Sequence, residues 1–196
     1  MPGMAQLGGF AENGAGCPGT DIGAADDTVS GPFNLGFTFP YPGGMGSTTS
    51  IDIAPNGYIY FEAGTNTSSR CCAGAFVGAP TANFLSATPS LAVFGHDLNA
   101  SATSVTGAGA IYFETGPGVA VISWQEVNAF GAAPITPNTF QVQLFANGTI
   151  VVDYRSTGFT EDALVGYSEG NGVADNGGVD LSAGASGMAG LSLIHI

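Results

Sequence analysis

Apolar and polar residues alternate along most of the chain, in short runs that Gly, Pro and Asn interrupt. This period of two, rich in β-branched and aromatic side chains, is typical of half-buried strands, and the 3.6-residue period of amphipathic helices is almost absent. Many short strands separated by turns predict an all-β fold, an antiparallel, jelly-roll-like β-sandwich with about nine to ten short strands. The nine expected strands cover Phe33–Phe39, Ser50–Ile53, Tyr58–Glu62, Leu91–Phe94, Ala110–Thr115, Val119–Val127, Thr139–Phe145, Thr149–Arg155 and Leu164–Ser168, and a short tenth one is expected near Val179–Leu181.

One hairpin can be placed in register from an Asn-Gly pair. A two-residue turn at Asn147-Gly148 would set Val142 opposite Asp153 and mix apolar with polar side chains on each face. A three-residue loop sets Val142 opposite Val152 and collects the apolar residues on one face. We therefore predict a type I turn followed by Gly148 in the left-handed region.

A second Asn-Gly pair, Asn56-Gly57, predicts another hairpin by the same reasoning. A three-residue loop that begins at Pro55 pairs Ile53 with Ile59. It also places the proline at the turn position that suits its fixed φ angle. These glycines and asparagines are therefore interpreted as turn residues that define the fold.

Both ends of the chain are rich in small residues, which suggests three regions. We expect an N-terminal arm over 1–20, without the basic and apolar segments of a signal peptide, and the sandwich domain over 21–182. A flexible linker and tail follow over 183–196. The last six residues, Leu191–Ile196, resemble translated sequencing-adaptor read-through, so we expect the final residues not to be native.

The charge balance excludes several classes of function. The chain has 2 basic and 15 acidic residues, with a net charge of −13, so the basic surface that nucleic-acid binding needs is missing. No apolar run approaches the roughly 20 residues of a membrane-spanning helix, so no membrane insertion is expected. Charged residues make up 9% of the chain, against roughly 25% in an ordinary soluble domain. Such a surface suits either a low-charge secreted protein or a subunit whose faces are buried in an assembly.

Three cysteines, Cys17, Cys71 and Cys72, are candidates for a disulfide. A bridge from Cys17 to either of the other two would tie the arm to the domain and, by the chain-entropy model, stabilise it by about 4 kcal/mol. The alternatives are a free or vicinally bonded thiol and, less favoured because no Cys-x2-Cys spacing occurs, a metal site. A disulfide implies an oxidising compartment.

Four carboxylates in turn-rich segments are candidate calcium ligands: Glu161, Asp162, Asp175 and Asp180. Carboxylate oxygens are the ligands that calcium prefers, but none of these segments has the spacing of a known calcium loop. The competing interpretation is that they are solvated turn residues. We expect no cofactor, and calcium is the one ion that the sequence leaves open.

Two further motifs suggest chemistry at first sight. His96 beside Asp97 follows a strand and could begin a hydrolytic triad, but no Gly-x-Ser-x-Gly nucleophile turn accompanies it. Trp124, the only tryptophan, lies in an apolar strand and is interpreted as a core residue in preference to a sugar-stacking platform. We therefore expect a protein that is not an enzyme.

Seven segments occur in an order that is recognisable: Phe37–Tyr41, Asn56–Phe61, Leu91–Asp97, Gly109–Phe113, Val121–Val127, Asn138–Thr149 and Ala163–Tyr167. The ordered set, over roughly residues 32–170, resembles the nidogen-like (NIDO-type) extracellular domain of a secreted bacterial protein. The resemblance implies a secreted β domain of the kind found in adhesive or matrix proteins, outside the cell or at its surface. That family has no established catalytic residues to carry over.

These observations favour a non-enzymatic structural or adhesive protein. We expect it to self-assemble into an extracellular filament or surface layer, through the terminal arms or strand edges, because backbone hydrogen bonds provide affinity whatever the side chains are. The alternative is an extracellular glycan-binding module, with or without calcium. Its site would be built by the loops Ala63–Ser90 and Asn99–Gly109, since loops on a rigid sandwich often carry binding.

Overall fold

The computed structural model describes residues 19–23, 26–44, 46–64, 84, 88–101, 109–130, 137–157 and 163–170. The strands are β1 (Thr20–Asp21), β2 (Ser30–Pro40), β3 (Ser47–Ala54), β4 (Tyr58–Tyr60), β5 (Ser90–Gly95), β6 (Leu98–Asn99), β7 (Ala110–Gly116), β8 (Val119–Ala129), β9 (Pro137–Phe145), β10 (Ile150–Ser156) and β11 (Leu164–Ser168), and a single 3-10 turn, η1, covers Pro42–Gly44. In this part of the chain, no helix has the length and the hydropathy to cross a membrane.

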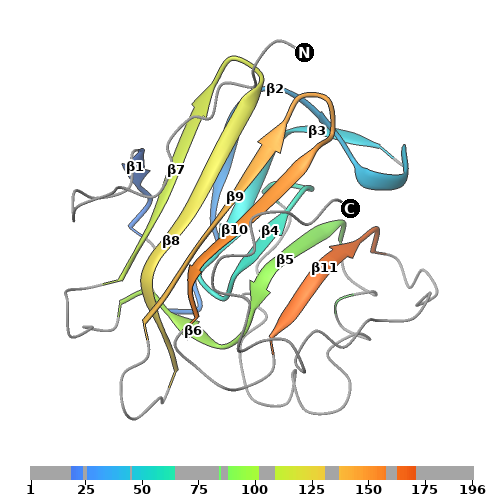
Figure 1. Ribbon diagram of the computed structural model, residues 1–196. Helices are drawn as coiled ribbons and strands as arrows, with labels where there is room; N and C mark the ends of the chain where they lie inside the picture. The colour runs from blue at the N-terminus through green and yellow to red at the C-terminus, as the bar shows by residue number, and fades with distance from the viewer. Residues whose placement is uncertain are drawn as a thin grey trace.

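The strands form two antiparallel sheets that pack face to face, which confirms the all-β sandwich (Figure 1). Sheet A, nearer the viewer in Figure 1, has the order β1-β7-β8-β9-β10, and β6 pairs with the end of β8. Sheet B has the order β11-β5-β4-β3-β2. Apart from β6, strands that follow one another within a sheet are therefore neighbours in it. The likeness to a jelly roll lies in the two layers, while the strand order is that of two meanders.

All nine strands expected within the described part are present, and two strands were not foreseen. β1 and β6 have two residues each, and two residues are too few to show an alternation of apolar and polar positions. Thr20 and Asp21 share β1, so a strand runs across the expected boundary between arm and domain. The strand expected near Val179–Leu181 lies outside the described residues.

The hairpin between β9 and β10 has the predicted register. Val152 lies opposite Val142, and Ile150 lies opposite Leu144. Gly148 has a φ of 86°, and its N–H donates to the carbonyl oxygen of Phe145 at 2.8 Å. The turn followed by a left-handed glycine is thus confirmed, together with the separation of apolar and polar residues onto opposite faces.

The hairpin between β3 and β4 is confirmed as well. Ile53 pairs with Ile59, and the N–H of Gly57 donates to the carbonyl oxygen of Ala54 at 3.2 Å. Gly57 has a φ of 77°, and a Cβ at this position would overlap the carbonyl oxygen of Phe94 in the neighbouring strand β5. Only glycine suits this turn, because both the backbone angle and the close approach of β5 exclude a side chain.

The core lies between the sheets, and a buried hydrogen bond crosses it. Trp124, fully buried as expected, stacks on Phe140 with ring centroids 4.9 Å apart. Tyr154 reaches from β10 in sheet A to β5 in sheet B, where its hydroxyl donates to the carbonyl oxygen of Val93 at 2.5 Å. Burial strongly raises the pKa of the Tyr154 hydroxyl, which therefore stays protonated and able to donate.

Candidate functional site

Asn56 organises one end of the sandwich, where β5 passes into β6. Its side-chain oxygen accepts a hydrogen bond from the backbone N–H of Leu98 at 2.7 Å, and its Nδ2 donates to Oδ1 of Asp27 at 2.9 Å. Its backbone carbonyl accepts from the N–H of His96 at 3.3 Å. Asn56 is fully buried, so this predicted turn residue also joins its hairpin to two segments that are distant in the sequence, one at Asp27 and one at His96–Leu98.

Three carboxylates gather around this asparagine. Burial, and then the charges of Asp27 and Asp26, raise the pKa of Asp97, while the charge of His96 acts in the opposite direction. Burial, followed by the charge of Asp27, also raises the pKa of Asp26. One carboxylate oxygen of Asp26, Oδ1, is buried without a hydrogen-bond partner. Burial first, and then the neighbouring carboxylates, therefore disfavour the charged forms of Asp26 and Asp97.

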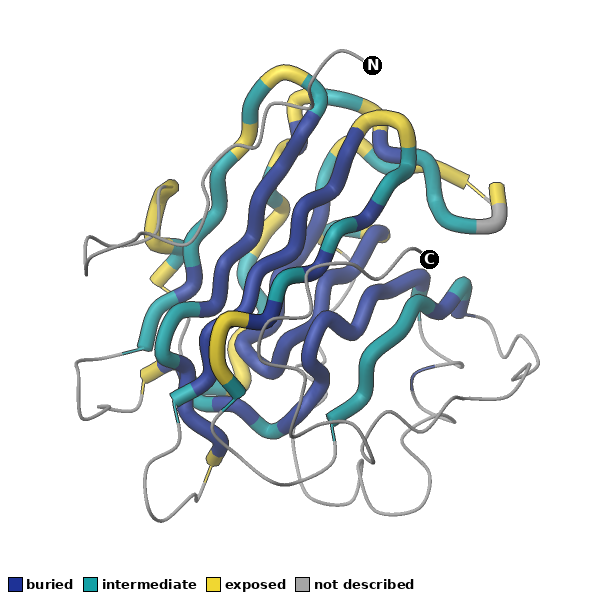
Figure 2. The backbone as a smooth tube through the Cα atoms, in the orientation of Figure 1, coloured by how far each residue is buried: buried dark blue, intermediate teal, exposed yellow. Residues whose placement is uncertain are grey.

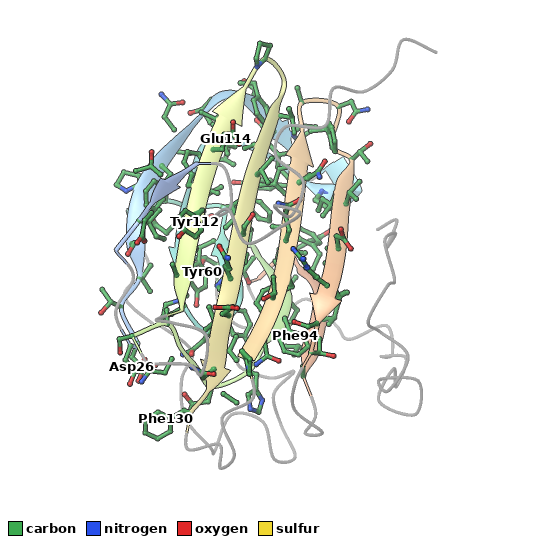
Figure 3. All side chains as sticks on the ribbon, turned by 60° about the vertical axis from the view of Figure 1, so that its left-hand side comes forward. Asp26, Tyr60, Phe94, Tyr112, Glu114 and Phe130 are labelled. Atoms are coloured by element: carbon green, nitrogen blue, oxygen red, sulfur yellow. The ribbon has the colours of Figure 1, made fainter. Side chains whose placement is uncertain are left out.

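An exposed aromatic ring lies beside the carboxylates. The backbone N–H of Phe130, just after β8, donates to the carbonyl oxygen of Asp97 at 2.7 Å. The Phe130 side chain is 61% exposed, and among the described residues it is the one large hydrophobic side chain that is exposed to solvent. Figure 3 shows Phe130 and Asp26 at the same end of the sandwich. A ring next to carboxylates offers both an apolar contact and hydrogen-bond acceptors to a ligand.

The described residues do not assemble a metal site. Among them, no group of three or more His, Cys, Asp and Glu side chains is arranged to hold an ion, and this includes the carboxylates around Asn56. The sequence-predicted calcium ligands Glu161, Asp162, Asp175 and Asp180 lie outside the described residues, and so do the cysteines Cys17, Cys71 and Cys72. The calcium and disulfide predictions thus stay predictions.

The outward side of sheet A carries a polar row on β8 and β9, on the face that the predicted hairpin register separates from the apolar residues. Gln141 donates through Nε2 to the hydroxyl of Ser123 at 2.8 Å, and Gln143 donates to Oε1 of Gln141 at 3.2 Å. Next to this row, Val119, Val121 and Phe145 form a small apolar cluster. We call these six residues the outer face of sheet A. All six are buried, and Gln141 is only 1% exposed.

A buried carboxylate on the outward side of sheet B was not foreseen. Asp52 is 1% exposed; its Oδ2 accepts from the N–H of Gly64 at 2.7 Å, and its Oδ1 has no partner. Burial raises its pKa, and the hydrogen bond from Gly64 acts in the opposite direction. The sequence places Asp52 in an alternating strand, where a polar residue is normally taken to face water.

The two outermost strands of sheet B carry no charged side chain. β2 has the sequence SGPFNLGFTFP over eleven residues, and β11 has the sequence LVGYS. By contrast β10, the last strand of sheet A, contains Asp153 and Arg155. Edge strands of monomeric proteins commonly carry charges that discourage pairing with another molecule. In the described part of the chain, both edges of sheet B lack this protection, although bulges and prolines interrupt β2.

Comparison with known proteins gives one match. The family model described as NIDO related matches residues 6–188, which is nearly the whole chain. Searches among curated proteins and among solved structures found no match.

Proposed function

The chain belongs to the NIDO-related family, and from this premise we propose that it is a non-enzymatic extracellular protein that self-assembles into a filament or surface layer. The nidogen-like resemblance implies adhesive or matrix proteins outside the cell, and the fold class agrees with that family. Self-assembly would use the strand edges or the terminal arm, with the edges of sheet B as the first candidates.

The observation that carries this proposal is the uncharged edge of sheet B. β2 presents seven residues, 33–39, without a charge, a proline or a buried polar side chain, with one irregularity in its pairing to β3 between Asn34 and Phe39; Phe33 and Phe37 are only partly buried. A strand from a second molecule could pair with this edge through backbone hydrogen bonds without desolvating a charge. The charge-poor composition of the whole chain extends the same property to the surface around the edge.

A single added charge tests the edge. Thr38 is an exposed residue of β2, so Thr38→Lys and Thr38→Glu each place a charge at the edge without touching the core. Ala146→Lys, in the exposed turn between β9 and β10, adds the same charge elsewhere and serves as the matched control. Light scattering after size-exclusion chromatography and electron microscopy, over a hundredfold range of concentration, would report the assembly.

We expect the unmodified protein and Ala146→Lys to grow in mass as the concentration rises. Both Thr38 variants should stay monomeric at concentrations about tenfold higher. If the unmodified protein is a monodisperse monomer throughout the range, the proposal is wrong. If all variants assemble alike, the edge of sheet B is not the contact.

One observation favours the second candidate function, an extracellular glycan-binding module. The exposed ring of Phe130 beside the carboxylates of Asp26 and Asp97 combines a stacking surface with hydrogen-bond acceptors. A glycan array, probed with and without calcium, tests it. Binding that Phe130→Ala abolishes and Ala146→Lys preserves would support this function, whereas an array without hits would remove it.

A further inference from the structure

The outer face of sheet A is buried although the described elements do not cover it. The six side chains point away from sheet B, because Ile122, Trp124 and Val142, their neighbours along β8 and β9, point into the core. Figure 2 looks onto this side of sheet A, where β8 and β9 are dark blue and no coloured element lies in front of them. Something other than the described strands therefore shields this face from water.

The chemistry of the face indicates what suits it. Val119, Val121 and Phe145 offer an apolar contact, with Val151 packed against them. The side chains of Gln143, Gln141 and Ser123 form hydrogen bonds with one another in a row. At the β7 side, Oε2 of Glu114 is buried without a partner, so it can still accept a backbone N–H. An uncharged peptide with small and apolar residues fits such a surface, because it brings no charge to desolvate.

The N-terminal arm is attached close to this face. β1 pairs with β7, with Thr20 opposite Phe113, so the arm leaves sheet A at the edge where only β7 separates it from β8. A Cβ built on Gly19 would lie 3.2 Å from Cβ of Glu114, whose side chain is on the same side of the sheet as Val121. Gly19 thus lies beside the edge of β7, and a substituent on it would point toward the outward side of the sheet.

The length and composition of the arm agree with this position. Eighteen extended residues span up to roughly 60 Å, whereas crossing from β7 over β8 to β9 requires about 10 Å. Residues 1–18 contain one charged side chain, Glu12, and the apolar residues Met4, Leu7 and Phe10 lie among five glycines. The glycines permit a close approach of backbone to sheet.

We propose that residues 1–18 fold back over the outer face of sheet A of their own chain and bury it. Thr20 holds the arm next to this face, so the local concentration of the arm is far above that of a second molecule. The apolar residues of the arm cover Val119, Val121 and Phe145, and a backbone N–H of the arm bonds Glu114. This proposal concerns a single chain and does not depend on self-assembly.

Hydroxyl-radical footprinting with residue-level mass spectrometry tests the proposal on three chains: the full protein, a chain that begins at Gly19, and a chain that ends at Gly170. Phe145, 8% exposed, is the reporter, and Phe140, which faces the core in the same strand, is the internal reference. Fluorescence of the buried Trp124 shows whether each chain is folded. A synthetic peptide of residues 1–18, and a scrambled version of it, are added back to the shortened chain.

We expect the modification of Phe145 to rise at least fivefold when residues 1–18 are removed, with Phe140 unchanged. The peptide, but not its scrambled version, should restore protection, and the chain that ends at Gly170 should stay protected. The proposal is overturned if Phe145 remains protected without the arm, or if removal of residues 171–196 exposes Phe145 instead. It is also overturned if Phe145 of the full protein loses its protection on dilution, because a second molecule would then supply the cover.

A second measurement applies if the shortened chain does not fold. In the full protein, a photoreactive benzoylphenylalanine replaces Phe10, and the cross-linked peptides are identified by mass spectrometry. Cross-links within one chain to residues 119–123 or 141–145 support the proposal. Cross-links that map only to other parts of the chain, or only between chains, contradict it.

Discussion

The hydrogen bond from Tyr154 to Val93 joins the two sheets through the middle of the core, and removing a single oxygen atom abolishes it. Tyr154→Phe deletes the hydroxyl and keeps the ring, which packs against Phe94 with centroids 5.9 Å apart and against Phe140 at 6.4 Å. The change therefore isolates the contribution of the hydrogen bond from that of the apolar contacts.

The expected cost follows from what remains behind. Tyr154 is fully buried and the donor lies 2.5 Å from the carbonyl oxygen of Val93, in a region that water does not reach. Leaving a buried acceptor without its partner costs about 1–3 kcal/mol. For a chain of this length, each 1 kcal/mol corresponds to a fall in Tm of about 2–4 °C.

Tyr167 provides a matched control with the opposite sign. Its hydroxyl is buried and has no hydrogen-bond partner, and burial, then the charges of Glu169 and Tyr41, raise its pKa to about 12. Tyr167→Phe removes a polar group that the folded state leaves unsatisfied. We therefore expect this variant to unfold at the same or a higher urea concentration than the unmodified protein.

Equilibrium unfolding in urea at pH 7, followed by the fluorescence of Trp124, measures both variants. The reasoning requires that Tyr154→Phe lowers the free energy of unfolding by about 1–3 kcal/mol, with an unchanged slope against urea. A loss below about 0.5 kcal/mol would refute it, because a buried carbonyl would then have lost its partner at no cost. Equal losses in the two variants would refute it as well.

Three further predictions concern charge, backbone and surface. Burial raises the pKa of several aspartates in the folded state, so the folded state binds protons more tightly than the unfolded one. The free energy of unfolding should therefore rise as the pH falls from 7 through these raised pKa values, with the full gain below the unfolded value of about 3.9. Asp52→Asn should stabilise the protein at pH 7 and flatten this rise, as measured by urea titrations. Gly57→Ala should lower the free energy of unfolding by about 3 kcal/mol or more, because the new Cβ meets the Phe94 carbonyl. Gly118→Ala has the same φ of 77° but only an ordinary contact at 3.7 Å, so it should cost about 1–2 kcal/mol. Similar losses of stability for the two variants in thermal unfolding would contradict the role of the close approach. Phe130→Ala should leave the urea midpoint unchanged within error, since its ring is mostly solvated, and a clear loss would show that the ring is buried in solution.

Alternation and turn chemistry were sufficient to predict the strands and two hairpin registers. The choice between two registers at Gly148 could be made because only one of them separates apolar from polar side chains. That reasoning also found both faces of β9 correctly. It could not tell whether the polar face is solvated, because alternation along one strand does not show what packs against a sheet, and Gln141 is buried.

The candidate site was the least predictable part. Asn56 was identified as a turn residue, yet its bonds to Asp27 and Leu98 depend on a close approach of segments 29 and 42 residues apart. The gathering of Asp26 and Asp97 has the same origin. In the sequence, a glutamine or asparagine in an alternating strand, or an Asn-Gly turn followed by a second polar segment, is at most a weak signal for such contacts. Two-residue strands such as β1 leave no pattern at all.

The two meanders determine the order in which this fold can be completed. Turns of a few residues join β7 to β8 and β9 to β10, so these hairpins close quickly and at a small entropic cost. β11 is different, because its partner β5 precedes the whole of β7–β10 in the sequence. Until the ribosome has released β11, β5 is the last strand of sheet B, and its sequence SLAVFG carries no charge. A chain whose final strand is not yet in place therefore presents β5 as an uncharged, unpaired edge, which favours pairing with other chains until β11 docks.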